Sequence, residues 1–259
     1  MSEIADKVLP VIRETRSILL PHWGNAGEVR NKGGGAIDVV TKYDIETEEF
    51  LADRLGKITP DAKFYAEENG GDKDGERYWV CDPIDGTGHY VRGLPFCTTM
   101  LALVENDAVV FSARYEFIND HLYHASLGEG AYRNSERIHV SERSLNAAYV
   151  SWESHTERPS NMERYLKLRS KANVFNVLAC GYECVMMASG KLDGRIAFDG
   201  FGKIWDYAPG SLLVSEAGGV ATNIGNGTYN PNNLECIYAN KPVYEALVLA
   251  PDAIFPLEK

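Results

Sequence analysis

The chain has 259 residues, of which 44% are hydrophobic and 24% are charged, and its formal net charge is −11. This composition is typical of a globular protein with one large domain or two small ones. An acidic surface repels polyanions, so we expect neither a nucleic-acid polymer nor an anionic membrane as partner. A small anionic substrate stays possible if a bound cation reverses the local charge.

The cysteines and the N-terminus indicate the compartment. The five cysteines form no Cys-x-x-Cys pair and several lie in apolar runs, so we expect reduced thiols in the core. The N-terminal stretch carries acids and bases throughout and lacks the apolar region of a signal peptide. The longest largely apolar run, residues 93–104, is too short to span a bilayer. These features predict a cytoplasmic protein.

The first half of the chain alternates between helical and strand patterns. Apolar spacing predicts an amphipathic helix over 3–20, with a proline inside it that could kink it, and a second helix over 42–58. Residues 63–68 and 77–82 are predicted as strands joined by a polar turn. Short β-like runs separated by turns predict an antiparallel meander over 97–140.

The second half continues this mixture without strict βαβ alternation. The predicted strands cover 147–152, 194–198 and 235–240, and the predicted helices cover 161–168, 182–192, 205–219 and 243–249. The helix over 205–219 is expected to have Asp206 as its N-cap and Pro209 in its first turn. With no repeat or long linker, the pattern predicts one α/β-layered domain over 1–259, in two lobes that join near 140–150.

Four acidic residues stand at the end of a predicted strand or the start of a predicted helix: Glu67, Asp82, Asp85 and Asp206. If the fold brings them together, they repel one another and raise each other's pKa. A divalent cation removes this repulsion, and oxygen ligands without supporting Cys or His indicate Mg²⁺, or Mn²⁺, rather than zinc. Two such metals about 3.5–4 Å apart form a clamp for phosphoryl displacement.

The stretch "DPIDGT" (82–87) suits this chemistry. Its proline stiffens the turn, which lets the two aspartates converge and frees the carbonyl of Ile84 as a neutral ligand. Gly86 allows the backbone to approach a ligand closely. The amides of Gly86 and Thr87 would begin a helix or turn that attracts phosphate oxygens, and the Thr87 hydroxyl can hold a water molecule.

Four motifs carry a resemblance to a known family. "WVCDPIDGTGHYVRGLP" (79–95) and "WDYAPGSLLVSEAGG" (205–219) resemble the two signatures of the inositol monophosphatase family. "DVVTKYD" (38–44) and "AEE" (66–68) resemble two shorter upstream elements of that family. The motifs follow the family's order and spacing over roughly 38–219, and the chain length matches a whole member.

The resemblance implies a layered αβαβα sandwich and a lithium-sensitive, Mg²⁺-dependent phosphomonoesterase, commonly a homodimer, with two or three ions and Mn²⁺ as a possible substitute. It implies that the metal ligands are Glu67, Asp82, Asp85, Asp206 and the Ile84 carbonyl, with Thr87 beside them. It assigns Asp44 and Thr87 to activation of a water, so no covalent enzyme intermediate is needed. It assigns phosphate binding to Gly86 and Thr87, and the binding of substrate hydroxyls to Asp199.

Departures from the family pattern leave the substrate open. His89 stands where asparagine is common, and "CGYEC" (180–184) replaces a small-residue segment that shapes the substrate pocket. Tyr182 and Glu183 could narrow or recharge that pocket, which makes Tyr182 a candidate substrate contact. Inositol monophosphate is the first expectation for the substrate. The alternatives are fructose-1,6-bisphosphate, histidinol phosphate, a nucleotide 2′- or 3′-phosphate, or a non-catalytic regulatory homologue.

Some residues have two interpretations. Asp44 and Asp206 could cap helices as well as act in the site. Glu67 is the preferred ligand of its pair, with Glu68 supporting it from outside. The run "GGG" (33–35) is either a slack loop or a mobile flap, with Lys32 as a possible phosphate neighbour.

Overall fold

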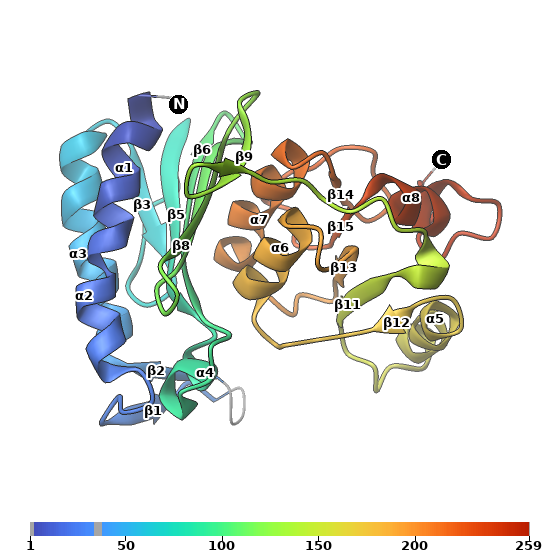
Figure 1. Ribbon diagram of the computed structural model, residues 1–259, viewed down its shortest axis with the longest axis horizontal. Coiled ribbons are helices and arrows are strands. Elements are labelled where there is room, and N and C mark those ends of the chain that lie inside the picture. Colours follow the sequence, from blue (N-terminus) through green and yellow to red (C-terminus); the bar gives the residue numbers. More distant parts are fainter. Residues whose placement is uncertain (1–2, 34–37, 259) are drawn as a thin grey trace.

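The computed structural model describes residues 3–33 and 38–258. Five layers follow one another across the molecule: helices, an eight-stranded sheet, two central helices, a five-stranded sheet and outer helices (Figure 1). This αβαβα arrangement confirms the predicted fold class. The described helices are α1 (Glu3–Glu14), α2 (Arg16–Leu19), α3 (Lys42–Ile58), α4 (Thr87–Arg92), α5 (Pro159–Arg169), α6 (Cys180–Ala188), α7 (Ile204–Glu216) and α8 (Lys241–Tyr244). Two 3₁₀ turns, η1 (Leu20–His22) and η2 (Leu145–Ala147), and a π turn, η3 (Glu245–Leu249), accompany them.

The larger sheet has the strand order β10-β9-β8-β7-β6-β5-β3-β4. Its strands are β3 (Lys63–Ala66), β4 (Gly70–Gly71), β5 (Arg77–Asp85), β6 (Thr98–Glu105), β7 (Ala108–Glu116), β8 (His121–Ser126), β9 (Gly130–Arg133) and β10 (Glu136–Arg137). From β5 to β10 each neighbouring pair is antiparallel, as the predicted meander requires. β5 is buried along almost its whole length because helices cover both faces of the sheet.

The two strands that the polar turn was predicted to join, β3 and β5, are neighbours in the sheet. β3 and β5 run parallel, and the short strand β4 pairs antiparallel with the other edge of β3. As a result, Glu67, which follows β3, and the aspartates at the end of β5 lie at the same edge of the sheet. The carboxyl ends of adjacent parallel strands meet there, and this is a common place for chemistry.

The smaller sheet has the strand order β12-β11-β13-β15-β14. Its strands are β11 (Tyr149–Glu153), β12 (Asn173–Val174), β13 (Gly194–Ala197), β14 (Val220–Asn223) and β15 (Cys236–Ala239). Residues 138–148 connect the two sheets, and α7 packs on strands of both. A separate pair, β1 (Val29–Asn31) with β2 (Val39–Thr41), leads into α3.

Several helix boundaries differ from the predicted ones. The first helical span divides at Thr15 into α1 and α2, and α1 continues through Pro10 to Glu14. The prediction that Asp206 is an N-cap is wrong, because the N-cap is Lys203 and Asp206 is the third residue of α7. From that position its Oδ2 accepts the Lys203 amide at 2.5 Å, so the carboxylate still satisfies the helix end. Pro209 lies beyond the first turn.

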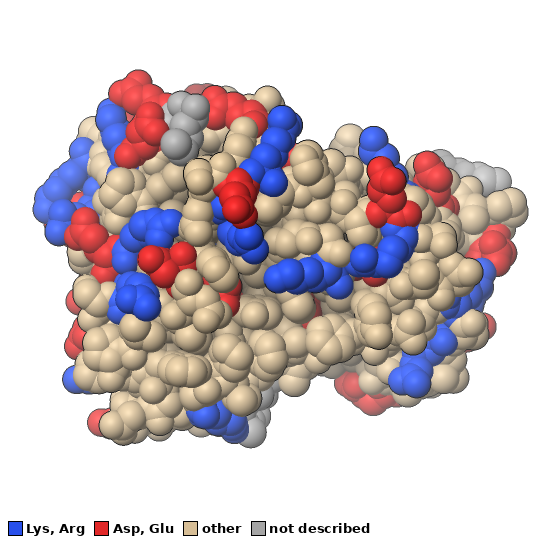
Figure 2. Space-filling view, viewed as in Figure 1, with Lys and Arg blue, Asp and Glu red and all other residues tan. Residues whose placement is uncertain are grey.

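Hydrophobic clusters fill the spaces between layers, and the five cysteines are buried free thiols, as expected. Acidic and basic side chains are interspersed on the face shown in Figure 2. Within 3–33 and 38–258, none of the helices has the length and apolar character to cross a bilayer.

Candidate active site

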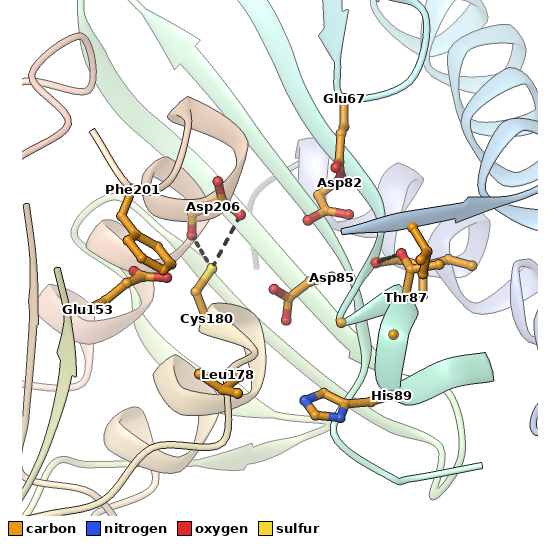
Figure 3. A pocket seen from close by; sticks show the side chains of 14 residues that line it. Glu67, Asp82, Asp85, Thr87, His89, Glu153, Leu178, Cys180, Phe201 and Asp206 are labelled. Atoms are coloured by element: carbon orange, nitrogen blue, oxygen red, sulfur yellow. Dashed lines mark hydrogen bonds between the residues drawn. The ribbon is translucent and has the colours of Figure 1, made fainter. Parts of the chain in front are cut away.

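The four carboxylates that the sequence singled out come from three separate segments and line one cavity of about 150 Å³, together with Glu153 (Figure 3). Glu67 comes from the end of β3, Asp82 and Asp85 from β5, and Asp206 from α7. The backbone at Ile84, Gly86 and Thr87 also lines the cavity. The structure therefore brings together the acids that the sequence singled out.

Burial and mutual repulsion raise the pKa values of these acids. The pKa of Asp82 lies well above its usual range because the group is buried and faces Glu67, Asp85 and Asp206. Burial raises the pKa of Asp206 to about 8, with Glu153 adding to the effect. Burial also raises the pKa of Asp85, although the buried Arg114 and the Gly181 amide oppose the rise. Without a cation, this site therefore disfavours full ionisation.

The donor set fits a divalent cation. Among the residues that the structure describes, Asp82 Oδ1 is buried without a hydrogen-bond partner, which is costly unless a ligand satisfies it. The ligand atoms of Asp85, Cys180 and Asp206 lie within 4.8 Å of one another, close enough to share one ion. Carboxylate and carbonyl oxygens dominate the cavity, and these are the ligands that hard cations prefer.

Tight turns hold Asp85 and its neighbours. Gly86 has φ 80°, and a Cβ there would lie 2.4 Å from the Phe96 carbonyl oxygen, so glycine is required. The amide of Gly181, in the first turn of α6, donates to Asp85 Oδ2 at 2.9 Å. A Cβ at Gly181 would lie 2.2 Å from Thr98 Oγ1 and 2.7 Å from Asp85 Oδ2. Small residues from distant segments thus make room for the carboxylate.

Asp44 and Thr87 form a hydrogen-bonded pair at the edge of the cavity. Thr87 Oγ1 lies 2.8 Å from Asp44 Oδ1 and 2.8 Å from the Ile84 carbonyl oxygen. The other oxygen of Asp44 accepts the amide of Thr41 at 2.8 Å and its hydroxyl at 2.6 Å, which fixes the start of α3. Burial raises the pKa of Asp44 to about 6 despite these hydrogen bonds. Asp44 therefore caps a helix and also orients the threonine hydroxyl.

A lysine neutralises the outer acids. Lys32 Nζ lies 2.8 Å from Glu67 Oε1 and 2.6 Å from Glu68 Oε1. Burial raises the pKa of Glu68 to about 7, an effect that Lys32 partly offsets. Glu68 is not among the described residues that line the cavity, and its supporting role beside Glu67 stays a prediction. Of the glycine run beside Lys32, positions 34 and 35 lie outside the described residues.

Two predicted substrate contacts do not line this cavity. Tyr182 packs edge-on against Phe96, with 5.2 Å between ring centroids, and lines a different cavity with Glu116 and His121. Asp199 accepts a hydrogen bond from Asn161 and pairs with Arg158 at 3.0 Å. Phe96 therefore holds Tyr182 outside the cavity, and Asn161 with Arg158 does the same for Asp199.

Of the other two departures from the family pattern, His89 lies in the cavity and Glu183 lies outside it. His89 lines the cavity, and its Nε2 lies 2.7 Å from the Val177 carbonyl oxygen. Glu183 is buried, with its carboxylate 3.2 Å from Arg195 Nε, and it does not reach the cavity. Glu183 is therefore an interior ion-pair residue, and its carboxylate does not change the charge of the cavity.

Sequence reasoning gave no role to several residues that line the cavity, among them Glu153, Leu178 and Phe201, whereas it named Cys180 as part of the pocket-shaping segment 180–184. Cys180 Sγ donates to the Asp206 carbonyl oxygen at 2.7 Å. Leu178 and Phe201 are about half exposed. Glu153 ends β11, and its position directly after a predicted strand was the one sequence signal that could have identified it. The others follow no motif and reach the site only through the fold.

Comparisons with known proteins show which proteins this chain is similar to. The profile of the inositol monophosphatase family matches residues 2–252. A fructose-1,6-bisphosphatase/inositol-1-monophosphatase of Thermotoga maritima is 32% identical over 94% of this chain and 93% of its own length. A putative Nus factor SuhB of Neisseria meningitidis serogroup B is 29% identical over 86% of this chain and 88% of its own. Among solved structures, a Thermotoga maritima IMPase superposes with a TM-score of 0.85 at 29% identity, covering 94% of each chain.

Proposed function

This chain belongs to the inositol monophosphatase family and is a phosphoric monoester hydrolase, and we propose that it hydrolyses inositol monophosphate with Mg²⁺. The observation that carries this proposal is the convergence of Glu67, Asp82, Asp85 and Asp206 beside the Asp44–Thr87 pair. We extend the proposal to one domain over residues 1–259, with two lobes that meet at this cavity.

Glu67, Asp82, Asp85, Asp206 and the Ile84 carbonyl would hold Mg²⁺, which would lower the pKa of a bound water and offset charge on the phosphate and on the leaving oxygen. The burial of Asp82 Oδ1 without a hydrogen-bond partner, within the part of the chain that the structure describes, supports its role as a ligand atom. Lys32 would keep Glu67 ionised and turned toward the cavity.

Thr87 and Asp44 supply the proton acceptor. When Asp44 is ionised, its Oδ1 accepts the Thr87 hydroxyl proton, which leaves a lone pair of Thr87 Oγ1 for an attacking water. As the water attacks phosphorus, its proton passes to Thr87 Oγ1 and the threonine proton passes to Asp44, while the bond between phosphorus and the ester oxygen breaks and the departing alcohol oxygen takes a proton from solvent. No side chain forms a bond to phosphorus in this scheme.

The start of α4 would hold the phosphate group. The first amides of a helix have no acceptor within that helix, and here they belong to residues 86–88, which line the cavity. The left-handed conformation of Gly86 lets this backbone approach closely. The phosphate would thus lie between α4 and the cation-binding acids.

Phosphate release tests the proposal directly. The purified protein is assayed on inositol monophosphate, fructose-1,6-bisphosphate, histidinol phosphate and nucleotide monophosphates, with Mg²⁺, with Mn²⁺, with a chelator and with added Li⁺. We expect hydrolysis of inositol monophosphate that needs Mg²⁺ and falls with Li⁺. Undiminished hydrolysis in the chelator would contradict the metal assignment. Binding of Mg²⁺ and phosphate without turnover of any ester would favour a regulatory homologue.

The remaining expectations stay predictions, namely lithium inhibition, a homodimer, a cytoplasmic location and two or three bound ions. Light scattering, localisation of the tagged chain and metal analysis of the loaded protein test the last three.

A further inference from the structure

A fully buried arginine lies behind the acid-lined cavity. Arg114, on β7, is 0% exposed, and an arginine side chain keeps its proton in a folded protein. Among the described residues, its Nε and Nη1 have no hydrogen-bond partner. Its Nη2 makes a long contact, 3.5 Å from the backbone carbonyl oxygen of Asp206. A buried cation with so few partners is costly unless nearby anions offset its charge.

The contacts of Arg114 lead to the acids of the cavity. The Asp206 carbonyl oxygen that it contacts also accepts the Cys180 thiol, at 2.7 Å. Cys180 Sγ and carboxylate oxygens of Asp85 and Asp206 all lie within 4.8 Å of one another. The charge of Arg114 reaches Asp85, because it opposes the rise that burial causes in the pKa of that group. The guanidinium is therefore one contact removed from the ligand atoms.

The fold leaves room for this guanidinium. Gly210 lies in the interior of α7, and a Cβ there would be 2.8 Å from Arg114 Nη2 and 2.6 Å from Cys184 Sγ. Glycine weakens the interior of a helix, so a glycine at this position has a packing reason. Two segments almost a hundred residues apart thus combine to keep a positive charge in the interior.

The other fully buried arginine near the cavity has partners of its own. Arg195 is 1% exposed, and its Nε lies 3.2 Å from Glu183 Oε2. Its Nη2 pairs with Glu153, which is not one of the predicted metal ligands. Within the part of the chain that the structure describes, Arg114 makes no such ion pair. The charge of Arg114 therefore bears on the acids that would hold the cation.

We propose that Arg114 is a positioning residue whose fixed charge lowers the affinity of these acids for Mg²⁺. It does not line the cavity, so it acts on the ion across Cys180 and the first turn of α7. Like charges repel strongly where water is excluded, and the ion carries two charges. This inference rests on the proposed metal-dependent function, because it needs Asp85 and Asp206 to bind the ion.

Calorimetric titration of the metal-free protein with Mg²⁺ tests the proposal, at about pH 9 so that protons compete least with the ion. Arg114→Met removes the charge and keeps a long side chain, a replacement that buried ionic groups often tolerate. We expect it to bind Mg²⁺ about tenfold more tightly than wild type, or more. Arg114→Lys keeps the charge and should stay near wild type.

The control removes the same charge from the surface. Arg54 lies at an exposed position on α3, where it pairs with Glu14 at 3.3 Å. Water and salt screen such a charge, so Arg54→Met should change the dissociation constant for Mg²⁺ by less than about twofold. Arg114→Gln removes the buried charge with a polar side chain and is titrated as a second neutral variant.

The charge of the ion gives a second readout. Coulomb energy is proportional to that charge, so a gain of about tenfold for Mg²⁺ becomes about thirtyfold for a trivalent ion at the same acids. Tb³⁺ binding, followed by its luminescence, measures this gain in wild type and in the neutral variants. A larger gain for Tb³⁺ than for Mg²⁺ would support the proposal, and a smaller gain would overturn it.

Other results would also overturn the proposal. Weaker or unchanged Mg²⁺ binding in the neutral variants would mean that Arg114 holds the backbone of Asp206 and does not weaken the ion's binding. A gain in Arg114→Lys equal to that in Arg114→Met would mean that side-chain shape decides, and not charge. Failure of the proposed function has a different signature, because wild type would then release phosphate from no ester, whatever its affinity for Mg²⁺.

Discussion

The two sheets contribute unlike halves to the cavity. The larger sheet and its flanking helices supply Asp82, Asp85 and the Asp44–Thr87 pair, which are buried and held by short hydrogen bonds or by the backbone of β5. The segments around the smaller sheet supply Leu178 and Phe201, which are exposed. The larger sheet and its helices thus hold most of the acids at fixed positions, and Asp206 on α7 and Glu153 at the end of β11 complete the acidic lining. Substitutions of the acids should affect the reaction itself, whereas substitutions of Leu178 and Phe201 should affect the choice of substrate.

The largest effect should come from Asp85→Asn. This change keeps the volume and removes one ligand charge, so we expect activity to fall by about 10³-fold or more, comparable to the loss of a key electrostatic group. Circular dichroism and the thermal midpoint should stay near those of wild type. Asp61→Asn, at an exposed position outside the cavity, is the control. Activity near wild type in Asp85→Asn would refute the ligand assignment.

Thr87→Ala should cost less, because it removes a proton acceptor and leaves the ligand acids in place. A positioned general base contributes about 10²–10⁴-fold, so we expect a loss of about 10²-fold, mostly in kcat. Thr87→Ser keeps the hydroxyl next to Asp44 and should recover most of the activity. If the serine variant is as slow as the alanine variant, the hydroxyl at position 87 is not the proton acceptor.

The stability of the metal-free protein should depend on pH. Asp206 has a folded-state pKa of about 8 and Asp44 of about 6, both above their unfolded values. The folded state thus binds these protons more tightly than the unfolded state does. The contribution of the two acids to the free energy of unfolding is complete below about pH 4, and it is lost as the pH rises through 6 and 8. We expect the free energy of unfolding to fall by roughly 5 kcal/mol between pH 5 and 8, as measured by urea titrations with chelator.

Mg²⁺ should reverse much of that fall at pH 8, because an ion that binds only the folded state stabilises it. Asp206→Asn should flatten the pH dependence. A metal-free protein that is more stable at pH 8 than at pH 5 would contradict the assigned burial of these acids.

Gly181→Ala tests the contact between the two halves. Its Cβ would meet Thr98 Oγ1 and Asp85 Oδ2, so we expect a loss of about 1–3 kcal/mol from overpacking, together with weaker Mg²⁺ binding. Gly56→Ala, in α3 with open space around its Cβ, is the control and should not destabilise the protein. Equal stability of the two variants would show that α6 does not press on Asp85.

The smallest effect should come from Leu178→Gly. The backbone of Leu178 is left-handed, and glycine adopts this conformation without strain, so we expect a gain of about 0.5 kcal/mol in unfolding free energy, with inositol monophosphate turnover retained. Urea denaturation of the variant and of wild type measures this difference. A marked loss of stability would mean that the exposed leucine side chain contributes packing.

Local sequence patterns were enough to predict an α/β-layered domain, the meander of the larger sheet and the acids that line the cavity, while the αβαβα order of layers came from the family resemblance. Apolar periodicity predicts each element, and the turn chemistry of "DPIDGT" places two aspartates within four residues. Only the tertiary structure showed that β3 and β5 are parallel, that Tyr182 packs against Phe96, and that Leu178 and Phe201 border the acids. Strand direction and side-chain partners depend on contacts between residues far apart in the chain, and no local pattern encodes those contacts.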